Sequence, residues 1–98
     1  MSAVERYLDL TRRALPERAR RERWPLREDH CFQRIVLDEV AGTVWYDRIP
    51  RPAYRNLTPA QAEQAAALAQ RLLDEGAPLV RELDRRSLER RGKAGPRR

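Results

Sequence analysis

A single stretch of the chain, from Thr58 to Gly76, carries both the start signal and the stop signal of an α-helix. Thr58 can cap the first turn, Pro59 suits the first helical position, and Gln61 completes a capping box. Gly76 follows the segment, where a glycine commonly ends a helix. The apolar residues between these signals recur at helical spacing and form one inward stripe: Ala65, Leu68, Ala69, Leu72 and Leu73. The segment predicts one long amphipathic helix.

The first residues of the chain also have a helical pattern. Ser2 and Glu5 form a capping box. The apolar positions of this segment have helical spacing: Val4, Tyr7, Leu8, Thr11 and Leu15. Pro16 has no amide hydrogen, so we expect the helix to stop near Leu15 or to restart with Pro16 in its first turn. The stretch 17–23 has almost no apolar residues, and we expect it to be solvated.

A further helix is predicted between Asp29, which can cap it, and Gly42, which can end it. Its apolar positions are Phe32, Ile35, Val36 and Val40. Trp24-Pro25 before it indicates an extended connector, because a residue that precedes proline avoids the α region. Residues 43–57 are expected to be an irregular loop, with a short strand at 43–46 as an alternative that has no clear partner strand.

The last predicted helix opens at Pro78. Its inward positions are Leu79, Val80, Leu83, Ser87 and Leu88. Gly92, Gly95 and Pro96 then end it. We therefore expect an all-α fold: a single domain of three to four helices over residues 1–91, an irregular loop rich in aromatic residues and proline, and a flexible, disordered basic tail over residues 92–98.

The length and composition limit the class of protein. Ninety-eight residues allow one domain with a modest core and exclude a large two-layer catalytic fold. No apolar run is long enough to cross a bilayer, and the first twenty residues are charged throughout, so we expect neither a membrane span nor a secretory signal. Cys31 is the only cysteine, which fits a reducing cytoplasm.

The positive charge is concentrated at the two ends of the chain. The net charge is +6 overall, +3 over residues 1–25 and +6 over residues 85–98, whereas residues 58–84 carry −3. A nearly neutral body with basic ends favours a partner that carries phosphates. We therefore predict a nucleic-acid-binding surface made by basic residues from both ends: Arg12, Arg13, Arg20, Arg23, Arg85, Arg86, Arg90, Arg91 and Lys93.

The loop from Trp45 to Arg55 interleaves aromatic residues with arginines. This composition is typical of surfaces on which nucleic-acid bases stack. The alternative is that these aromatic residues cover the edge of the core, as they commonly do beside prolines in a small helical domain.

His30, Arg34 and Asp38 recur every four residues and are expected on the helix face opposite Phe32, Ile35 and Val36. Arg34 could bind an anion there, with His30 placed for proton transfer. The alternative is a solvated face with a weak pair between Arg34 and Asp38. A single histidine with no nucleophile beside it is not a catalytic set, so we predict no catalytic residue.

The sequence argues against a metal centre. His30 and Cys31 are the only imidazole and the only thiol, and adjacent helical residues point about 100° apart. They cannot share one metal, and no second histidine or cysteine completes a tetrahedral site. We expect no metal and no cofactor.

Several short motifs carry a family resemblance when they are read together: Asp29-His30-Cys31-Phe32, Arg34-Ile35, Leu37-Asp38, Trp45-Tyr46, Ala53-Tyr54, Leu57-Thr58, Ser87-Leu88 and Arg91-Gly92-Lys93. With these motifs the chain resembles a group of small bacterial proteins, of about this length, that are often labelled GNAT-type acetyltransferases. The chain lacks the residues for that family's mixed sheet and its pyrophosphate-binding motif, so no catalytic residue follows. The resemblance singles out six positions as a ligand site: His30, Arg34, Asp38, Trp45, Tyr46 and Tyr54.

Three functions follow from these patterns. The first is a non-enzymatic cytoplasmic protein that binds nucleic acid through its two basic ends. The second is an acetyltransferase-related protein or accessory that binds an acyl-coenzyme A or another anionic ligand near His30, Arg34 and Tyr46. The third is a protein-interaction module or homodimer that pairs through the small residues Ala65, Ala66 and Ala69. We expect no membrane partner.

Overall fold

The computed structural model describes residues 1–92. The helices are α1 (Ala3–Asp9), a π-helical turn (Leu10–Ala14), α2 (Leu15–Glu22), α3 (Asp29–Ala41), a 3-10 helix (Trp45–Asp47), α4 (Ala53–Asn56), α5 (Pro59–Glu75) and α6 (Ala77–Arg90). No strand is present in residues 1–92, so the prediction of an all-α fold is confirmed. The predicted flexible tail, with Lys93, Gly95 and Pro96, lies outside the described residues from position 93 onward.

Of the two alternatives predicted for the first segment, the structure has the second: the helix does not stop near Leu15 but restarts with Pro16 in its first turn. The chain widens into the π-helical turn, in which the Leu15 amide donates to the Leu10 carbonyl five residues back. Pro16 then falls in the first turn of α2, where its missing amide hydrogen costs nothing. The prediction that residues 17–23 are solvated is right only in part, because Ala19 is fully buried.

The predicted ends of α3 are close to the observed ones. Glu28 holds the cap position, one position earlier than predicted, and Asp29 is the first helical residue. The Asp29 carboxylate instead accepts the His30 amide at 2.7 Å. Gly42 ends α3 with a φ of 74°, a left-handed conformation that suits glycine. The residues considered for a strand contain the 3-10 helix instead.

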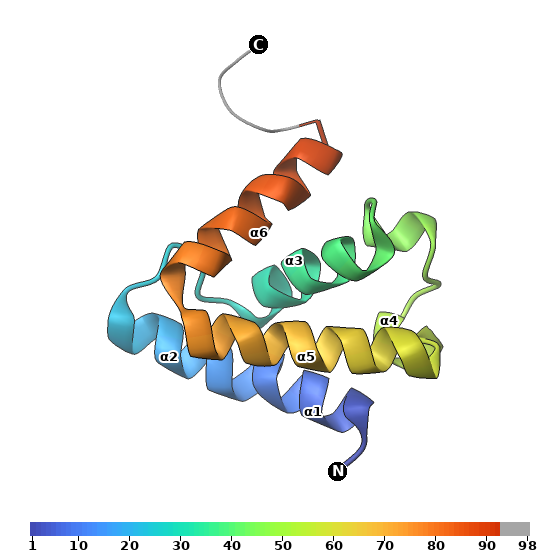
Figure 1. The fold of residues 1–98 in the computed structure, drawn as a ribbon, viewed down its shortest axis with the longest axis horizontal. Helices are drawn as coiled ribbons and strands as arrows, with labels where there is room; N and C mark the ends of the chain where they lie inside the picture. Colours follow the sequence, from blue (N-terminus) through green and yellow to red (C-terminus); the bar gives the residue numbers. More distant parts are fainter. Residues whose placement is uncertain (93–98) are drawn as a thin grey trace.

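The signals around α5 are confirmed. The Gln61 amide donates to the Thr58 hydroxyl at 3.1 Å, and the Thr58 amide donates to the Gln61 side chain at 2.9 Å. Gly76, with a φ of 77°, separates α5 from α6. Since only one residue joins them, α6 turns back from the end of α5 and leaves it at an angle (Figure 1).

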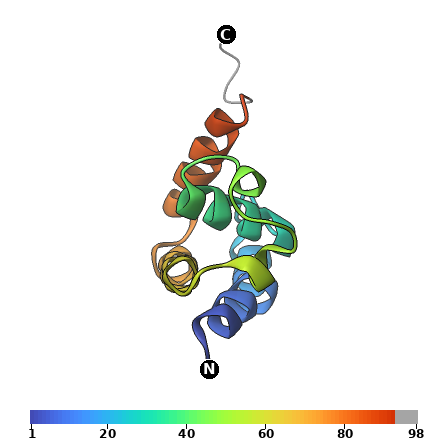
Figure 2. The ribbon, with the colours of Figure 1, turned by 90° about the vertical axis from the view of Figure 1, so that its right-hand side faces the viewer.

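Helices α1 and α3 pack against α5, and α6 packs against α3. Figure 2 views α5 nearly along its axis, with α3 and α1 on either side of it. Ala65, Ala66 and Ala69 are fully buried in the core that these helices share. The prediction of a homodimer through these alanines is therefore wrong. Their small side chains allow close approach between helices of the same chain.

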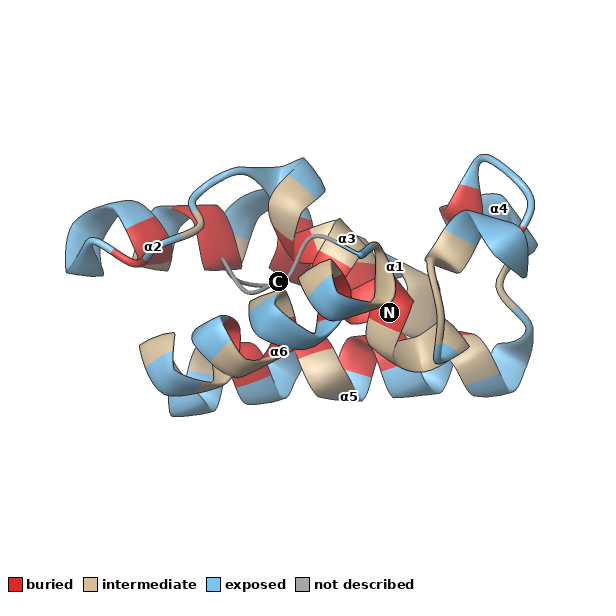
Figure 3. Cartoon of the chain, turned by 90° about the horizontal axis from the view of Figure 1, so that it is seen from above, coloured by how far each residue is buried: buried red, intermediate tan, exposed pale blue. Residues whose placement is uncertain are grey.

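The buried side chains gather where α1, α3 and α5 meet, and the outer faces of α5 and α6 are exposed (Figure 3). The largest fully buried side chains include Phe32, Leu15, Ile35 and Leu72. Within residues 1–92, no helix combines the length and the apolar character that crossing a membrane requires.

Candidate functional site

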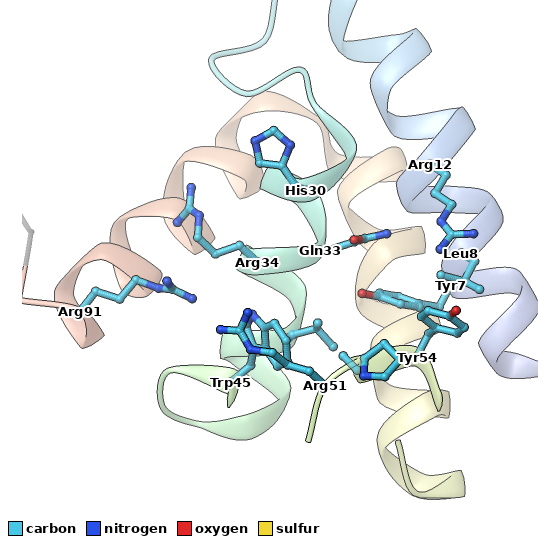
Figure 4. A pocket seen from close by; sticks show the side chains of 13 residues that line it. Tyr7, Leu8, Arg12, His30, Gln33, Arg34, Trp45, Arg51, Tyr54 and Arg91 are labelled. Carbon is cyan, nitrogen blue, oxygen red and sulfur yellow. The ribbon is translucent and has the colours of Figure 1, made fainter. Parts of the chain in front are cut away.

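A cavity of about 520 Å³ lies where α1, α3 and α4 approach the loop that carries Trp45. Its volume falls within the range of roughly 300–1,000 Å³ that is common for small-molecule sites. Figure 4 shows its walls: side chains from α1 and the π-helical turn on one side, α3 along the back, and Trp45, Arg51 and Tyr54 from the loop and α4. The end of α6 contributes Arg91.

The lining combines aromatic rings with guanidinium groups. The rings are those of Tyr7, Trp45 and Tyr54, and the guanidinium groups are those of Arg12, Arg34, Arg51 and Arg91. The remaining side chains are Leu8, His30, Gln33, Leu37, Pro52 and Ala53. Among residues 1–92, no aspartate or glutamate lines this cavity. Arg34 and Arg91 are paired with carboxylates behind the wall, so the charge that attracts an anion is that of Arg12 and Arg51.

Two of these guanidinium groups have no carboxylate partner within residues 1–92: Arg12 and Arg51. Arg12 lies over the Tyr54 ring, 5.4 Å from its centroid. Arg51 lies over two rings, 5.4 Å from the Trp45 centroid and 4.7 Å from the Tyr46 centroid. Stacking on a ring orients a guanidinium group and leaves its N–H donors free, so both side chains can still bind an anion.

The other two guanidinium groups belong to a network between α3 and α6. Arg34 donates to the Asp84 carboxylate at 2.7 Å and to the Ser87 hydroxyl at 2.8 Å. The Ser87 hydroxyl donates to Asp38 at 2.7 Å, and Arg91 donates to both oxygens of Asp38, at 2.9 and 3.0 Å. This network fixes one wall of the cavity.

Asp38 is the centre of that network. It is fully buried on α3, and its carboxylate also accepts the Trp45 amide at 2.9 Å. Burial by itself would raise the pKa of Asp38, but the hydrogen bonds from Arg91, Ser87 and the Trp45 amide outweigh it and lower the pKa below its ordinary value. Asp38 is therefore ionised in the folded protein and holds Arg91 and the start of the Trp45 loop in place.

We expect the substitution Asp38→Asn to destabilise the protein less as the pH falls below about 4. The folded pKa is lower than the unfolded one, so the carboxylate contributes its full stability above the ordinary value of about 3.9 and loses it as the pH falls through the folded value. Urea unfolding of both proteins between pH 7 and pH 3 measures this. A difference in unfolding free energy that is constant over this range would contradict the role of Asp38.

Tyr7 lies at the inner end of the cavity. It is only 2% exposed, and its hydroxyl has no hydrogen-bond partner within residues 1–92. Figure 4 shows the ring directed away from α1, with the hydroxyl toward the middle of the lining side chains. Burial raises the pKa of Tyr7 far above neutral pH, so the hydroxyl keeps its proton and offers a hydrogen-bond donor.

Four of the six positions that the resemblance singled out line the cavity: His30, Arg34, Trp45 and Tyr54. Asp38 lies behind the wall, and the exposed Tyr46 packs beside it against Arg51 and Arg91. The prediction that Arg34 and Asp38 share a solvated face as a weak pair is wrong, because α6 covers that face and Arg34 pairs with Asp84. His30 itself is exposed.

Sequence reasoning missed Tyr7, Gln33 and Arg51 as parts of the site. The sequence pattern places Tyr7 on the inward stripe of the first helix, which is correct. The pattern does not show that the Tyr7 hydroxyl lies in a cavity. Arg51 belongs to the loop of alternating rings and arginines, which was the available signal. No sequence signal points to Gln33, because a polar residue between the apolar positions of a helix is ordinarily a surface residue.

The basic residues predicted to bind nucleic acid do not form one surface. At the end of α6, Arg85 pairs with Glu82 and Glu89, Arg86 with Glu82 and Glu39, Arg90 with Glu39, and Arg91 with Asp38. That end of α6 lies across the molecule from α1 and α2 (Figures 1 and 2). Arg13 pairs with Asp9, whereas Arg12, Arg20 and Arg23 have no carboxylate partner within residues 1–92. Lys93 lies outside these residues.

In the part of the chain that the structure describes, no three His, Cys, Asp or Glu side chains come together as metal ligands would. Cys31 is partly buried and free. No family model, curated protein or solved structure matches this chain. The resemblance to GNAT-labelled bacterial proteins therefore stays a prediction, and the functional argument depends on the cavity itself.

Proposed function

We propose that this chain is a non-enzymatic binding protein for a small anionic ligand, which it holds in the cavity between α1, α3 and the Trp45 loop. The observation that carries the proposal is the composition of the wall: four arginines, three aromatic rings and no carboxylate. Arg12 and Arg51 supply the charge, because no carboxylate in residues 1–92 neutralises them. Guanidinium groups bind phosphate and carboxylate through paired N–H donors.

A binding role is favoured over catalysis by what surrounds His30. Its ring is exposed, with Nδ1 3.6 Å from the Asp29 carboxylate. Among residues 1–92, neither a serine or threonine hydroxyl nor a cysteine thiol lines the cavity beside His30. A histidine with no protein nucleophile beside it in residues 1–92 has no group of the chain to activate by removing a proton. The single, partly buried Cys31 remains in keeping with a cytoplasmic location.

A thermal-shift panel tests the proposal. Ribose 5-phosphate, pyrophosphate, adenosine monophosphate and acetyl-coenzyme A are each added at millimolar concentration, with ribose and sodium chloride as controls. A ligand present at 100 times its dissociation constant adds about 2.7 kcal/mol, which raises the Tm of a domain of this size by roughly 10 °C or more. At least one anion should raise the Tm above both controls. No shift with any anion would refute the proposal.

Acetyl-coenzyme A has a separate purpose in this panel. It is the ligand that the resemblance to acetyltransferase-labelled proteins implies, and it is itself anionic. A shift with acetyl-coenzyme A that exceeds the shift with adenosine monophosphate would favour the acetyltransferase-related alternative. Equal shifts would assign binding to the nucleotide part alone.

Nucleic-acid binding is the second candidate, and one observation favours it. Arg20, Arg21 and Arg23 are exposed at the end of α2, and none has a carboxylate partner within residues 1–92. A duplex or a single strand that lies along this end would be held by phosphate contacts alone. Affinity would then fall by about 0.9 log units per log unit of salt for each phosphate contact on a duplex. No binding to either form at low salt would remove this candidate.

A further inference from the structure

We propose that the ligand of the cavity is a nucleoside phosphate, with its base against Tyr7 and Gln33 and its phosphate on one of the two unpaired arginines of the lining, Arg12 or Arg51. The inference rests on the proposed function and names the ligand class of the same site. Two observations carry it. The buried Tyr7 hydroxyl and the Gln33 amide lie together at the inner end of the cavity, and the unpaired charges of the lining, on Arg12 and Arg51, lie on exposed side chains.

The orientation of the Gln33 amide follows from its neighbours. The Thr11 hydroxyl donates to the Tyr7 carbonyl at 2.9 Å, so its proton is already committed. Thr11 Oγ1 must then act as an acceptor toward Gln33, whose Nε2 lies 3.3 Å away. The side-chain nitrogen of Gln33 thus faces Thr11, and its carbonyl oxygen has no partner within residues 1–92 (Figure 4). That oxygen is an acceptor available to a ligand.

The Tyr7 hydroxyl is the matching donor. It is buried, it is directed into the cavity, and nothing in residues 1–92 pairs with it. Buried polar groups are nearly always hydrogen-bonded, so an unpaired one inside a cavity indicates that a partner comes from outside the chain. Tyr7 and Gln33 together offer one donor and one acceptor. The edge of a nucleobase carries the complementary acceptor and donor side by side.

The remaining lining fits the other parts of such a ligand. The rings of Trp45 and Tyr54 line the cavity, each with an arginine stacked over it, so a planar base can pack against a ring or against its stacked guanidinium group. Arg12 and Arg51 hold their positions over these rings and have free N–H donors for a phosphate. An inorganic anion would use only the arginines, and a neutral planar molecule would use only the rings and the inner polar pair. A nucleoside phosphate uses all three.

Isothermal titration calorimetry tests the inference with five probes: the adenosine, guanosine, cytidine and uridine monophosphates, and ribose 5-phosphate. We expect at least one nucleotide to bind 10-fold or more tightly than ribose 5-phosphate. Equal affinity for ribose 5-phosphate and all four nucleotides would overturn the inference and leave the proposed function standing. No binding by any of the five probes would also overturn the inference, and the proposed function would then be refuted only if pyrophosphate and acetyl-coenzyme A gave no thermal shift either.

Two variants separate the base from the phosphate. Tyr7→Phe should weaken binding of the preferred nucleotide by about 3- to 10-fold, the effect of one hydrogen bond between neutral groups, and should leave ribose 5-phosphate unchanged. Gln33→Met, which removes the acceptor at similar length, should do the same. Gln70→Met is the matched control, because Gln70 is exposed on α5 and outside the lining. Unchanged nucleotide affinity in both variants would overturn the inference.

Tyr7→Phe is expected to fold at least as well as the wild type, since the hydroxyl it removes has no partner within residues 1–92. A single-stranded hexamer of the preferred base identifies the source of the nucleotide. Tighter binding of the mononucleotide supports a free metabolite, and tighter binding of the hexamer supports the end of a nucleic-acid strand. If Tyr7→Phe and Gln33→Met both left the affinity for the hexamer unchanged, the inference would be overturned.

Discussion

Asp38→Ala should destabilise the folded protein by about 3–4 kcal/mol, because it removes one partner of a buried ion pair. The substitution leaves the Arg91 guanidinium, the Ser87 hydroxyl and the Trp45 amide without their acceptor. Arg91 can turn partly toward solvent, since its side chain is 17% exposed, which limits the loss. Small domains have only about 5–15 kcal/mol of total stability, so the variant is expected near its unfolding threshold.

Urea unfolding of wild-type protein and Asp38→Ala at neutral pH measures this loss. Asp9→Ala is the matched control, because Asp9 also pairs with an arginine, Arg13, but does so on an exposed helix face. Exposed pairs contribute little, so the control should unfold close to the wild type. If both variants lost the same stability, the Asp38 network would have no special role in holding α6 on α3.

The double substitution Arg12→Gln and Arg51→Gln should weaken binding of every anionic ligand by about 10-fold or more, because it removes whichever of the two arginines the anion contacts. Hydrogen bonds between charged groups contribute about 1.5–3 kcal/mol each, which corresponds to a factor of about 10 or more for each arginine. Both side chains are exposed, so the lower end of this range applies. Neither arginine has an ion pair within residues 1–92, so stability should change little.

Calorimetric titration of the double variant measures the loss. Its matched control is Arg20→Gln with Arg21→Gln, which removes the same net charge from exposed positions of α2 that do not line the cavity. The control should retain wild-type affinity for small anions. If the control lost as much affinity as the variant, the attraction would come from the net charge of the whole chain and not from the cavity.

The elements of the fold were predictable where local signals agree with one another. The capping boxes at Ser2 and Thr58, and the glycines at positions 42 and 76, mark helix ends as predicted. Pro16 predicts either a stop near Leu15 or a restart of the helix, and the structure has the restart, with a π-helical turn before it. No local sequence signal predicts the π-helical turn at Leu10–Ala14.

The candidate site was predictable only in part. The resemblance groups His30, Arg34, Trp45 and Tyr54 as a ligand site, whereas the residue pattern by itself gives only a helix stripe and a loop. The burial of Asp38 depends on α6 returning over α3, a contact between residues about 50 positions apart in sequence. The pairing of the α6 arginines depends on the same contact through Glu39. Charge counts along a sequence cannot show which charges are neutralised in this way.

The central claim is that the cavity beside Trp45 binds an anionic ligand, and the two tryptophans of the chain allow a direct measurement. Trp45 lines the cavity, whereas Trp24 is buried elsewhere with its indole N–H donated to Glu22. Two-dimensional NMR of ¹⁵N-labelled protein, titrated with adenosine monophosphate, follows both indole signals. We predict saturable shifts of the Trp45 indole and the Gln33 and Tyr54 amides, with the Trp24 indole unmoved. Shifts confined to α2, or no saturable shift at Trp45, would contradict the claim.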